Sequence, residues 1–282
     1  AFWATIVPSY DRTPALRRGE QGALFNSPYG DLFDVVIPDA PDPKNLDKVL
    51  STYKAAILAG DIKITPVVTR ILTDYVQKGG TLILNVKQLD EVFPSKFAGL
   101  RRTSQNVNLS DWPDYTAERV VLCGAEVLTA SEKKIPLLTL NHYGKGNVIV
   151  SCVDSWVPRL TAESVSHTRR GLLQFPFIQD VLKRLTEETI PFRVEGDIQF
   201  GINKTKDGWL IYLINNKGVT KMADTPEKTD PKAAAKIVVR WNNLPVNNVR
   251  ELLTCETVPV NGNSTAVTVP PGEIRILNFV CR

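Results

Sequence analysis

The sequence lacks the motifs that mark several large classes of enzyme. Neither G-x-G-x-x-G nor G-x-x-x-x-G-K-[ST] occurs, so the fingerprints of dinucleotide and P-loop nucleotide binding are missing. No G-x-S-x-G nucleophile elbow is present. The 2 histidines, His142 and His167, do not stand in a metal-ligand spacing. We therefore expect no catalytic residue, metal or cofactor that can be named from a motif.

The sequence also lacks features of membrane and nucleic-acid-binding proteins. No apolar run approaches the ~20 residues that span a bilayer, so we expect no membrane partner. The 34 Lys and Arg residues nearly balance the 30 Asp and Glu residues, which gives a net charge of +4. Basic pairs are scattered among acids rather than gathered in a stripe, so no nucleic-acid partner is expected.

Cysteine is scarce, with 4 residues and no C-x-x-C pair, which argues against a structural zinc site. Cys255 and Cys281 lie in strand-like segments, so they are candidates for a disulfide across a sheet, with buried free thiols as the alternative. Cys123, in "VLCGAE", fits a buried structural thiol better than a nucleophile.

The start of the chain and its sequons bear on where the protein acts. The sequence begins at Ala1 and enters a strand-like run at once, so we expect a chain that was processed or cut from a longer one. No charged segment followed by an apolar segment marks a signal peptide. Three Asn-x-Ser/Thr sequons, at Asn108, Asn203 and Asn263, favour a secreted or periplasmic protein.

Residues 1–191 alternate strand and helix signals, which predicts a parallel sheet with helical crossovers. The best-marked helix is preceded by Thr65 as a cap and begins at Pro66, and we expect Gly79 and Gly80 to end it in the left-handed conformation. Continuous apolar runs around it predict buried strands. These runs are "FWATIVPS", "LFDVVIP", "AAILAGD" and "TLILNV". A hairpin is predicted to turn at "YGKGN".

Residues 192–282 change to short strands separated by turns such as "TKDG", "NNKG" and "PPG". This pattern predicts an all-β sandwich. The predicted fold class is thus α/β: a flavodoxin-like parallel sheet domain (1–191) followed by a β-sandwich domain (192–282).

Two acids follow predicted strands and are the candidate functional groups. Asp61 and Asp154 are expected at the carboxyl edge of the sheet, where open α/β folds bind ligands, with Tyr10 and Trp156 beside them. Carboxylates and aromatic rings suit a crevice that contacts carbohydrate. The alternative is that both acids are loop caps at strand ends.

The run "YKAAILAGDIKITPVVTRILTDYVQKGGTLILNV" resembles the class I glutamine-amidotransferase-like domain of bacterial glycoside hydrolases, especially the trimerisation domain of one family of β-galactosidases. In that domain a Y-K-x-hydrophobic strand leads to a helix that ends in Y-V-x-x-G-G-T-L. The segment "GKGNVIV" resembles the family's glycine-turn strand, and "VRELLTCETVPV" with "VPPGEIRILNF" resembles its terminal β-sandwich. The elbow cysteine and the His–Glu pair of true amidotransferases are missing here.

The resemblance implies a non-catalytic C-terminal part of a carbohydrate-active glycoside hydrolase, which aids assembly and substrate positioning. Its implied partners are a catalytic (β/α)₈ barrel, an oligosaccharide or polysaccharide substrate, and further copies of the chain. Two rival hypotheses remain. One is a self-contained carbohydrate hydrolase or deacylase that uses the carboxylates at the sheet edge. The other is a sugar-binding module with exposed tryptophans, for which Trp112 and Trp156 are candidates, whereas Trp209 and Trp241 fit a core better.

Overall fold

The structure is a computed structural model, and its chain forms two compact units. The first contains residues 2–6 and 33–181, and the second contains residues 29–32 and 182–281. The division falls inside a helix, α4 (Pro176–Thr189), whereas the sequence-based boundary follows residue 191. The structure describes residues 2–6, 29–36, 45–59, 64–89, 93–94, 96–111, 115–153, 176–222 and 224–281.

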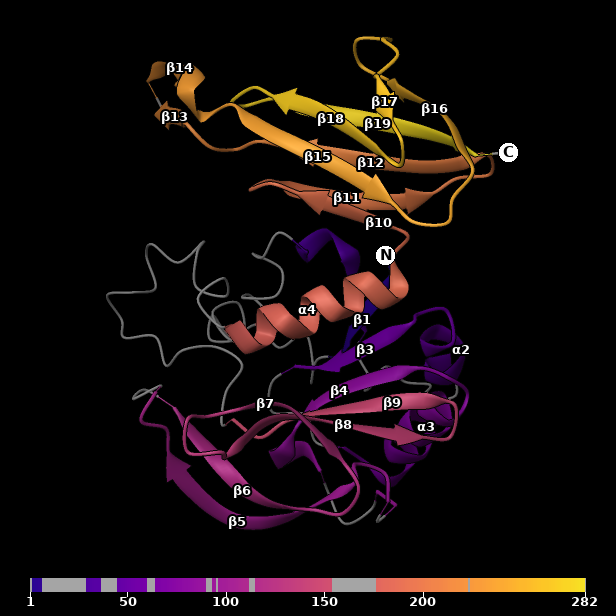
Figure 1. The fold of residues 1–282 in the computed structure, drawn as a ribbon, viewed down its shortest axis with the longest axis vertical. Coiled ribbons are helices and arrows are strands. Elements are labelled where there is room, and N and C mark those ends of the chain that lie inside the picture. The colour runs from indigo at the N-terminus through magenta and orange to yellow at the C-terminus, as the bar shows by residue number, and fades with distance from the viewer. Residues whose placement is uncertain are drawn as a thin grey trace. The chain divides into compact units, whose positions relative to one another are not determined.

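The first unit is built on a seven-stranded sheet with the order β2-β1-β3-β4-β9-β8-β7. Figure 1 shows β3, β4, β9 and β8 of this sheet side by side. Five neighbouring strands are parallel, and their order is that of a flavodoxin-like sheet. They are β1 (Trp3–Ile6), β2 (Phe33–Val36), β3 (Ala55–Leu58), β4 (Thr81–Asn85) and β9 (Gly146–Ser151). The predicted hairpin is confirmed, because β8 (Pro136–Tyr143) pairs antiparallel with β9 and turns at Gly144. The edge strand is β7 (Glu126–Ala130).

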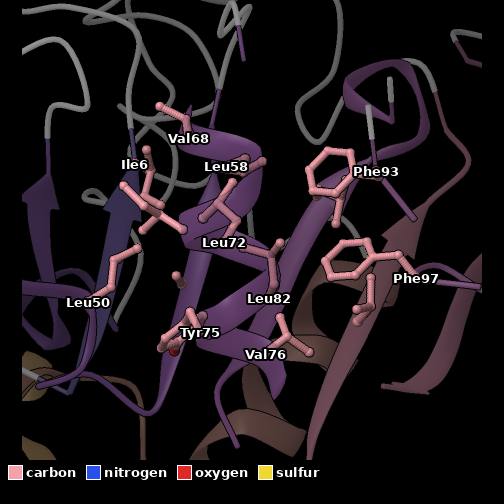
Figure 2. Packing of buried hydrophobic residues seen from close by; sticks show 14 of the residues in the cluster. Ile6, Leu50, Leu58, Val68, Leu72, Tyr75, Val76, Leu82, Phe93 and Phe97 are labelled. Atoms are coloured by element: carbon pink, nitrogen blue, oxygen red, sulfur yellow. The ribbon is translucent and has the colours of Figure 1, made fainter. Parts of the chain in front are cut away.

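One face of this sheet packs against α2 (Leu46–Leu50) and α3 (Pro66–Gln77). Alternate strand positions enter this core, as expected for strands whose side chains point to opposite faces. Figure 2 shows Leu72, Tyr75 and Val76 of α3 gathered with Leu58 and Leu82 of the strands.

The ends of α3 agree with its sequence signals, with one correction. The Thr65 side chain accepts a hydrogen bond from the Val68 N–H at 3.3 Å, and Pro66 is the first helical residue. Gly79 adopts a positive φ of 114°, but Gly80 does not. Gly80 is needed for a different reason: a Cβ there would overlap the Tyr75 ring.

A two-stranded ribbon is formed by β5 (Leu100–Asn108) and β6 (Thr116–Leu122), in a region where the sequence shows no regular strand or helix pattern. Sequence analysis missed β5, whose strand is mostly polar and exposed. The ribbon joins the main sheet where the Glu118 N–H donates to the Cys152 carbonyl at 2.8 Å. A short 3-10 helix, η3 (Val86–Gln88), follows β4.

The second unit contains two four-stranded antiparallel sheets, β10-β15-β18-β17 and β11-β12-β19-β16, which confirms the predicted β-sandwich. Aromatic rings join them in the core, with Phe279 of β19 lying 4.9 Å from Phe192 of β10 and 5.5 Å from Trp241 of β15. Trp241 is buried, as the sequence predicted, whereas Trp209 is only partly buried: its ring packs on Phe192, and Lys204 Nζ lies 5.8 Å from its centroid. The strands are β10 (Phe192–Glu195), β11 (Gln199–Lys204), β12 (Gly208–Ile214), β15 (Ala235–Trp241), β16 (Val246–Glu251), β17 (Val260–Asn261), β18 (Ser264–Val269) and β19 (Ile274–Cys281).

Two further pieces complete the second unit. A hairpin of β13 (Val219–Met222) and β14 (Thr225–Thr229) is followed by the 3-10 helix η6 (Pro231–Ala233). The 3-10 helix η1 (Gly30–Leu32) packs on β11, where the rings of Tyr29 and Phe200 lie 5.8 Å apart. A segment from early in the chain is therefore part of the C-terminal unit.

The expected disulfide is not formed, because Cys255 and Cys281 are both free thiols. The register explains this correction. Val246, at the start of β16, pairs with Cys281, whereas Cys255 lies in the turn beyond the other end of β16. Cys255 is exposed and has a positive φ of 60°. Cys123 is also exposed rather than buried, because it lies in the turn after β6.

Candidate functional site

The carboxyl edge of the parallel sheet is where the sequence placed a functional crevice. All four candidate residues, Tyr10, Asp61, Asp154 and Trp156, lie outside the described residues, as do Trp112 and His167. The described part of this edge comprises the ends of β1, β3, β4 and β9 and the start of η3. Its chemistry can be read from the groups that follow β4.

The polar groups after β4 are bound to the backbone. The Asn85 side chain is 6 % exposed, donates to the Val153 carbonyl at 2.6 Å and accepts from the Lys87 N–H at 3.0 Å. The Gln88 side chain accepts from the Asn85 N–H and donates to the Leu58 carbonyl, which closes a capping box. Asn85 and Gln88 thereby tie the ends of β3, β4 and β9 together. In this turn both polar side chains are engaged in hydrogen bonds that join strand ends.

A buried acid lies near this turn. Glu118 of β6 is 3 % exposed, and its carboxylate accepts two hydrogen bonds from the Arg102 guanidinium, at 3.0 and 2.8 Å. The Ser104 N–H donates to the same carboxylate. Burial pushes the pKa of Glu118 upward, but the bonds from Arg102 and Ser104 outweigh it and hold the pKa below its ordinary value. Glu118 is therefore an ionised structural group rather than a general acid.

The thiol and imidazole groups near the sheet are not arranged for catalysis. Burial raises the pKa of Cys152 to about 12, so its thiol stays protonated at neutral pH and is a poor nucleophile. His142 is exposed, and its Nδ1 lies 2.7 Å from the Asn147 side-chain oxygen. Among the residues that the structure describes, no group of three or more His, Cys, Asp or Glu side chains is placed to hold a metal ion.

The motif that carries the family resemblance lies at the opposite, amino-terminal edge of the same sheet. Tyr53 and Lys54 precede β3, and Gly79 and Gly80 precede β4. The Thr81 N–H donates to the Lys54 carbonyl at 3.0 Å, which holds the two strand starts in register.

Tyrosines tie this edge to its neighbours. The Tyr75 hydroxyl donates to the Tyr53 carbonyl at 3.2 Å, and the Tyr53 hydroxyl donates to the Asp34 carboxylate at 2.7 Å. Burial and the bond to Asp34 raise the pKa of Tyr53 to about 12, so it remains a donor. Each bond uses a motif residue to join elements that are distant in sequence.

The glycines of the motif allow close packing at the same edge. The hairpin turn between β8 and β9 docks on the end of α3, where the Lys145 N–H donates to the Gln77 carbonyl and the Asn147 N–H donates to the Gly80 carbonyl. A Cβ on Gly146 would overlap the Gly80 and Val76 carbonyl oxygens. The glycine pattern therefore reflects backbone contact, and no reacting group is needed to explain it.

A groove of about 260 Å³ opens beside this motif, between the C-terminal ends of α2 and α3. Its walls include Asp47, Asp74 and Lys78, which sequence analysis did not single out because exposed charges on helices read as solvated positions. The groove brings together groups that the sequence left unconnected.

The comparisons with known proteins bear on the fold. No family model matches the sequence, and no curated protein matches it. One similar solved structure is a catalytic mutant of a GH42 beta-galactosidase from G. stearothermophilus, with a TM-score of 0.57 and 14 % identity over 99 % of this chain and 40 % of that one. Another is a beta-galactosidase from Bacillus circulans sp. alkalophilus, with a TM-score of 0.53 and 14 % identity over 98 % of this chain and 41 % of that one.

A third is alpha-L-fucosidase isoenzyme 2 from Paenibacillus thiaminolyticus, with a TM-score of 0.56 and 14 % identity over 99 % of this chain and 48 % of that one. The chain thus spans less than half the length of these structures. The likeness confirms, at the level of the fold, the resemblance that the sequence motifs predicted. Separately, the described residues contain no helix that is long and apolar enough to cross a membrane.

Proposed function

We propose that this chain is a non-catalytic region of a carbohydrate-active glycoside hydrolase, where it aids assembly and substrate positioning. The observation that carries the proposal is the coverage: nearly the whole chain matches a fold that makes up 40 % to 48 % of three glycoside hydrolase chains. A (β/α)₈ barrel of ~250 residues is then the partner that would carry the hydrolysis of an oligosaccharide or polysaccharide.

The chemistry of the described residues supports this assignment. Hydrolysis of a glycoside needs two carboxyl groups ~5 to 9 Å apart with access to substrate. The buried carboxylate of Glu118 is held by Arg102, and that of Glu251 by backbone amides, so each has a structural role. A scaffold that positions other groups is the simplest function for such a framework.

The first test compares activity and mass. The purified chain is assayed on nitrophenyl glycosides, and we expect no hydrolysis above buffer. The intact mass of the native protein, measured without denaturation, should reveal a longer precursor or a co-purifying chain large enough for a barrel. A lone chain from a complete reading frame that hydrolyses a glycoside, with activity lost in Asp61→Asn or Asp154→Asn, would overturn the proposal in favour of a self-contained hydrolase.

Assembly and location belong to the same proposal. Homo-oligomers are expected for the native protein, and sedimentation at several concentrations checks them. A secreted or periplasmic location is favoured by the three sequons and is checked by fractionating the producing cells.

A further inference from the structure

The lining of the groove at the amino-terminal edge of the sheet includes two aromatic side chains and one aliphatic side chain. Tyr53, Ile71 and Tyr75 contribute to its lining, and the ring of Tyr53 is partly exposed. The hydrogen bonds from Tyr75 to the Tyr53 carbonyl and from Tyr53 to Asp34 hold both rings in place. A ligand would therefore meet a preformed surface, which lowers the entropic cost of binding.

The rim of the groove carries two acids and two bases. Asp47 and Asp74 are exposed on α2 and α3, and Lys54 and Lys78 are exposed at the strand start and the helix end. One oxygen of Asp47 accepts from the Lys48 N–H at 2.7 Å. No ion pair or side-chain hydrogen bond engages Asp74, Lys54 or Lys78 within the part of the chain that the structure describes.

These groups remain available to a ligand. Asp74 in α3 and Lys78 at its C-cap are four residues apart, a spacing at which an ion pair in solution stabilises a helix only slightly. A ligand that forms a hydrogen bond with Asp74 and another with Lys78 therefore has no strong interaction between these side chains to break.

The balance of charge indicates the class of ligand. Two carboxylates and two ammonium groups cancel, so the groove has no net attraction for an anion or a cation. Carboxylates accept and ammonium groups donate hydrogen bonds, and sugar hydroxyls do both. Its volume of about 260 Å³ lies below the ~300 to 1,000 Å³ that enclose drug-sized ligands, which fits a single ring.

We propose that this groove binds one neutral sugar ring of a glycan, with the ring on Tyr53 and its hydroxyls between Asp74 and Lys78. The site lies at the amino-terminal edge of the sheet, whereas the candidate crevice with Asp61 follows the strands at the carboxyl edge. The choice of a sugar rests on the proposed function, and the choice of a neutral ligand rests on the groove. A glycan contact here would help the chain to hold polysaccharide away from a catalytic centre.

The test is a titration of the ¹⁵N-labelled chain with methyl β-D-galactopyranoside, followed by amide chemical shifts. We expect saturable shifts at Lys54, Gly79 and Gly80 with a Kd in the millimolar range. Asp74→Asn and Lys78→Gln should each weaken binding about fivefold or more. Arg70→Gln is the matched control, because Arg70 is exposed on the same helix and does not line the groove. Dispersed spectra of all variants establish that they fold.

Three results would overturn the inference. The first is the absence of saturable shifts at the groove. The second is unchanged affinity in the double variant Asp74→Asn/Lys78→Gln. The third is tighter binding of galacturonate or galactosamine, since either would mean that a charged ligand is preferred. None of these results bears on the native mass or on the glycosidase assay, so a failure of the groove is distinguishable from a failure of the proposed function.

Discussion

Glu251 gives the sharpest prediction about the pH dependence of stability. Its side chain is 4 % exposed and ends β16, where its carboxylate accepts the Ile276 N–H at 2.9 Å and the Thr254 N–H at 2.5 Å. Burial pushes the pKa of Glu251 upward, but these backbone amides, with that of Leu253, outweigh it and lower the pKa from 4.5 to about 2. The folded state therefore favours the ionised form.

The sign and size of the effect follow from linkage. A carboxyl whose pKa is depressed on folding stabilises the protein above its ordinary pKa, and this stability is lost as the pH falls toward the folded pKa. The shift corresponds to about 3 kcal/mol of unfolding free energy at pH 7, lost between about pH 5 and pH 2. Glu251→Gln removes the titrating group, so its destabilisation relative to wild type should be largest at neutral pH.

Urea unfolding at a series of pH values measures this difference. The gap in unfolding free energy between wild type and Glu251→Gln should narrow by about 2 to 3 kcal/mol between pH 7 and pH 3. Glu256→Gln, an exposed substitution in the same turn, is the control, and it should leave the unfolding free energy unchanged at both pH 7 and pH 3. A gap that is the same at pH 3 as at pH 7 would refute the assignment of the stabilisation to the ionised carboxylate.

Three further predictions concern the first unit. Gly80→Ala should lower the unfolding free energy by more than about 2 kcal/mol in urea titrations, because its Cβ overlaps the Tyr75 ring; a loss below 0.5 kcal/mol would show that the ring moves freely. Arg102→Met should lower the unfolding free energy by about 3 kcal/mol, because it leaves the buried Glu118 carboxylate unpaired. The double variant Arg102→Met/Glu118→Leu should recover much of that loss. If the single and double variants lose the same unfolding free energy, the pairing is contradicted. In a timed reaction with a thiol reagent, the buried thiol of Cys152 should stay unlabelled until the chain unfolds, whereas the exposed cysteines react at once.

The sequence predicted helices and strands best where local chemistry and burial indicate the same element. In α3 the Thr65 cap and Pro66 indicate the same helix start, and the structure has both. Strands β1, β3 and β4 are continuous apolar runs that are buried along their whole length, so they stand out from any solvent-exposed pattern, whereas the edge strand β2 exposes Asp34 and Val35. The alternation of strand and helix signals was enough to predict a parallel sheet with helical crossovers.

The misses have physical reasons. Strand β5 is mostly polar, since a two-stranded ribbon buries little on either side, so its sequence lacks the alternation that reveals a strand. The disulfide prediction failed because pairing depends on register, and the register of β16 and β19 separates the two cysteines. Gly80 was assigned to a helix end by local rules, whereas a ring contact from the preceding helix fixes it.

The two edges of the parallel sheet show why a motif can be informative about fold without locating a site. At the carboxyl edge, the side chains of the described residues Asn85 and Gln88 donate hydrogen bonds that join strand ends. At the amino-terminal edge, Tyr53, Tyr75 and Gly80 are needed for packing, and the same packing shapes a groove whose charged rim is open to solvent. The motif residues at this edge are therefore explained by their packing in the fold. The residues that would confer binding, Asp74 and Lys78, are not fixed by that packing and need not belong to any motif. Substitutions at these two positions should change ligand affinity while leaving the fold intact, whereas substitution of Gly80 should destabilise the fold itself.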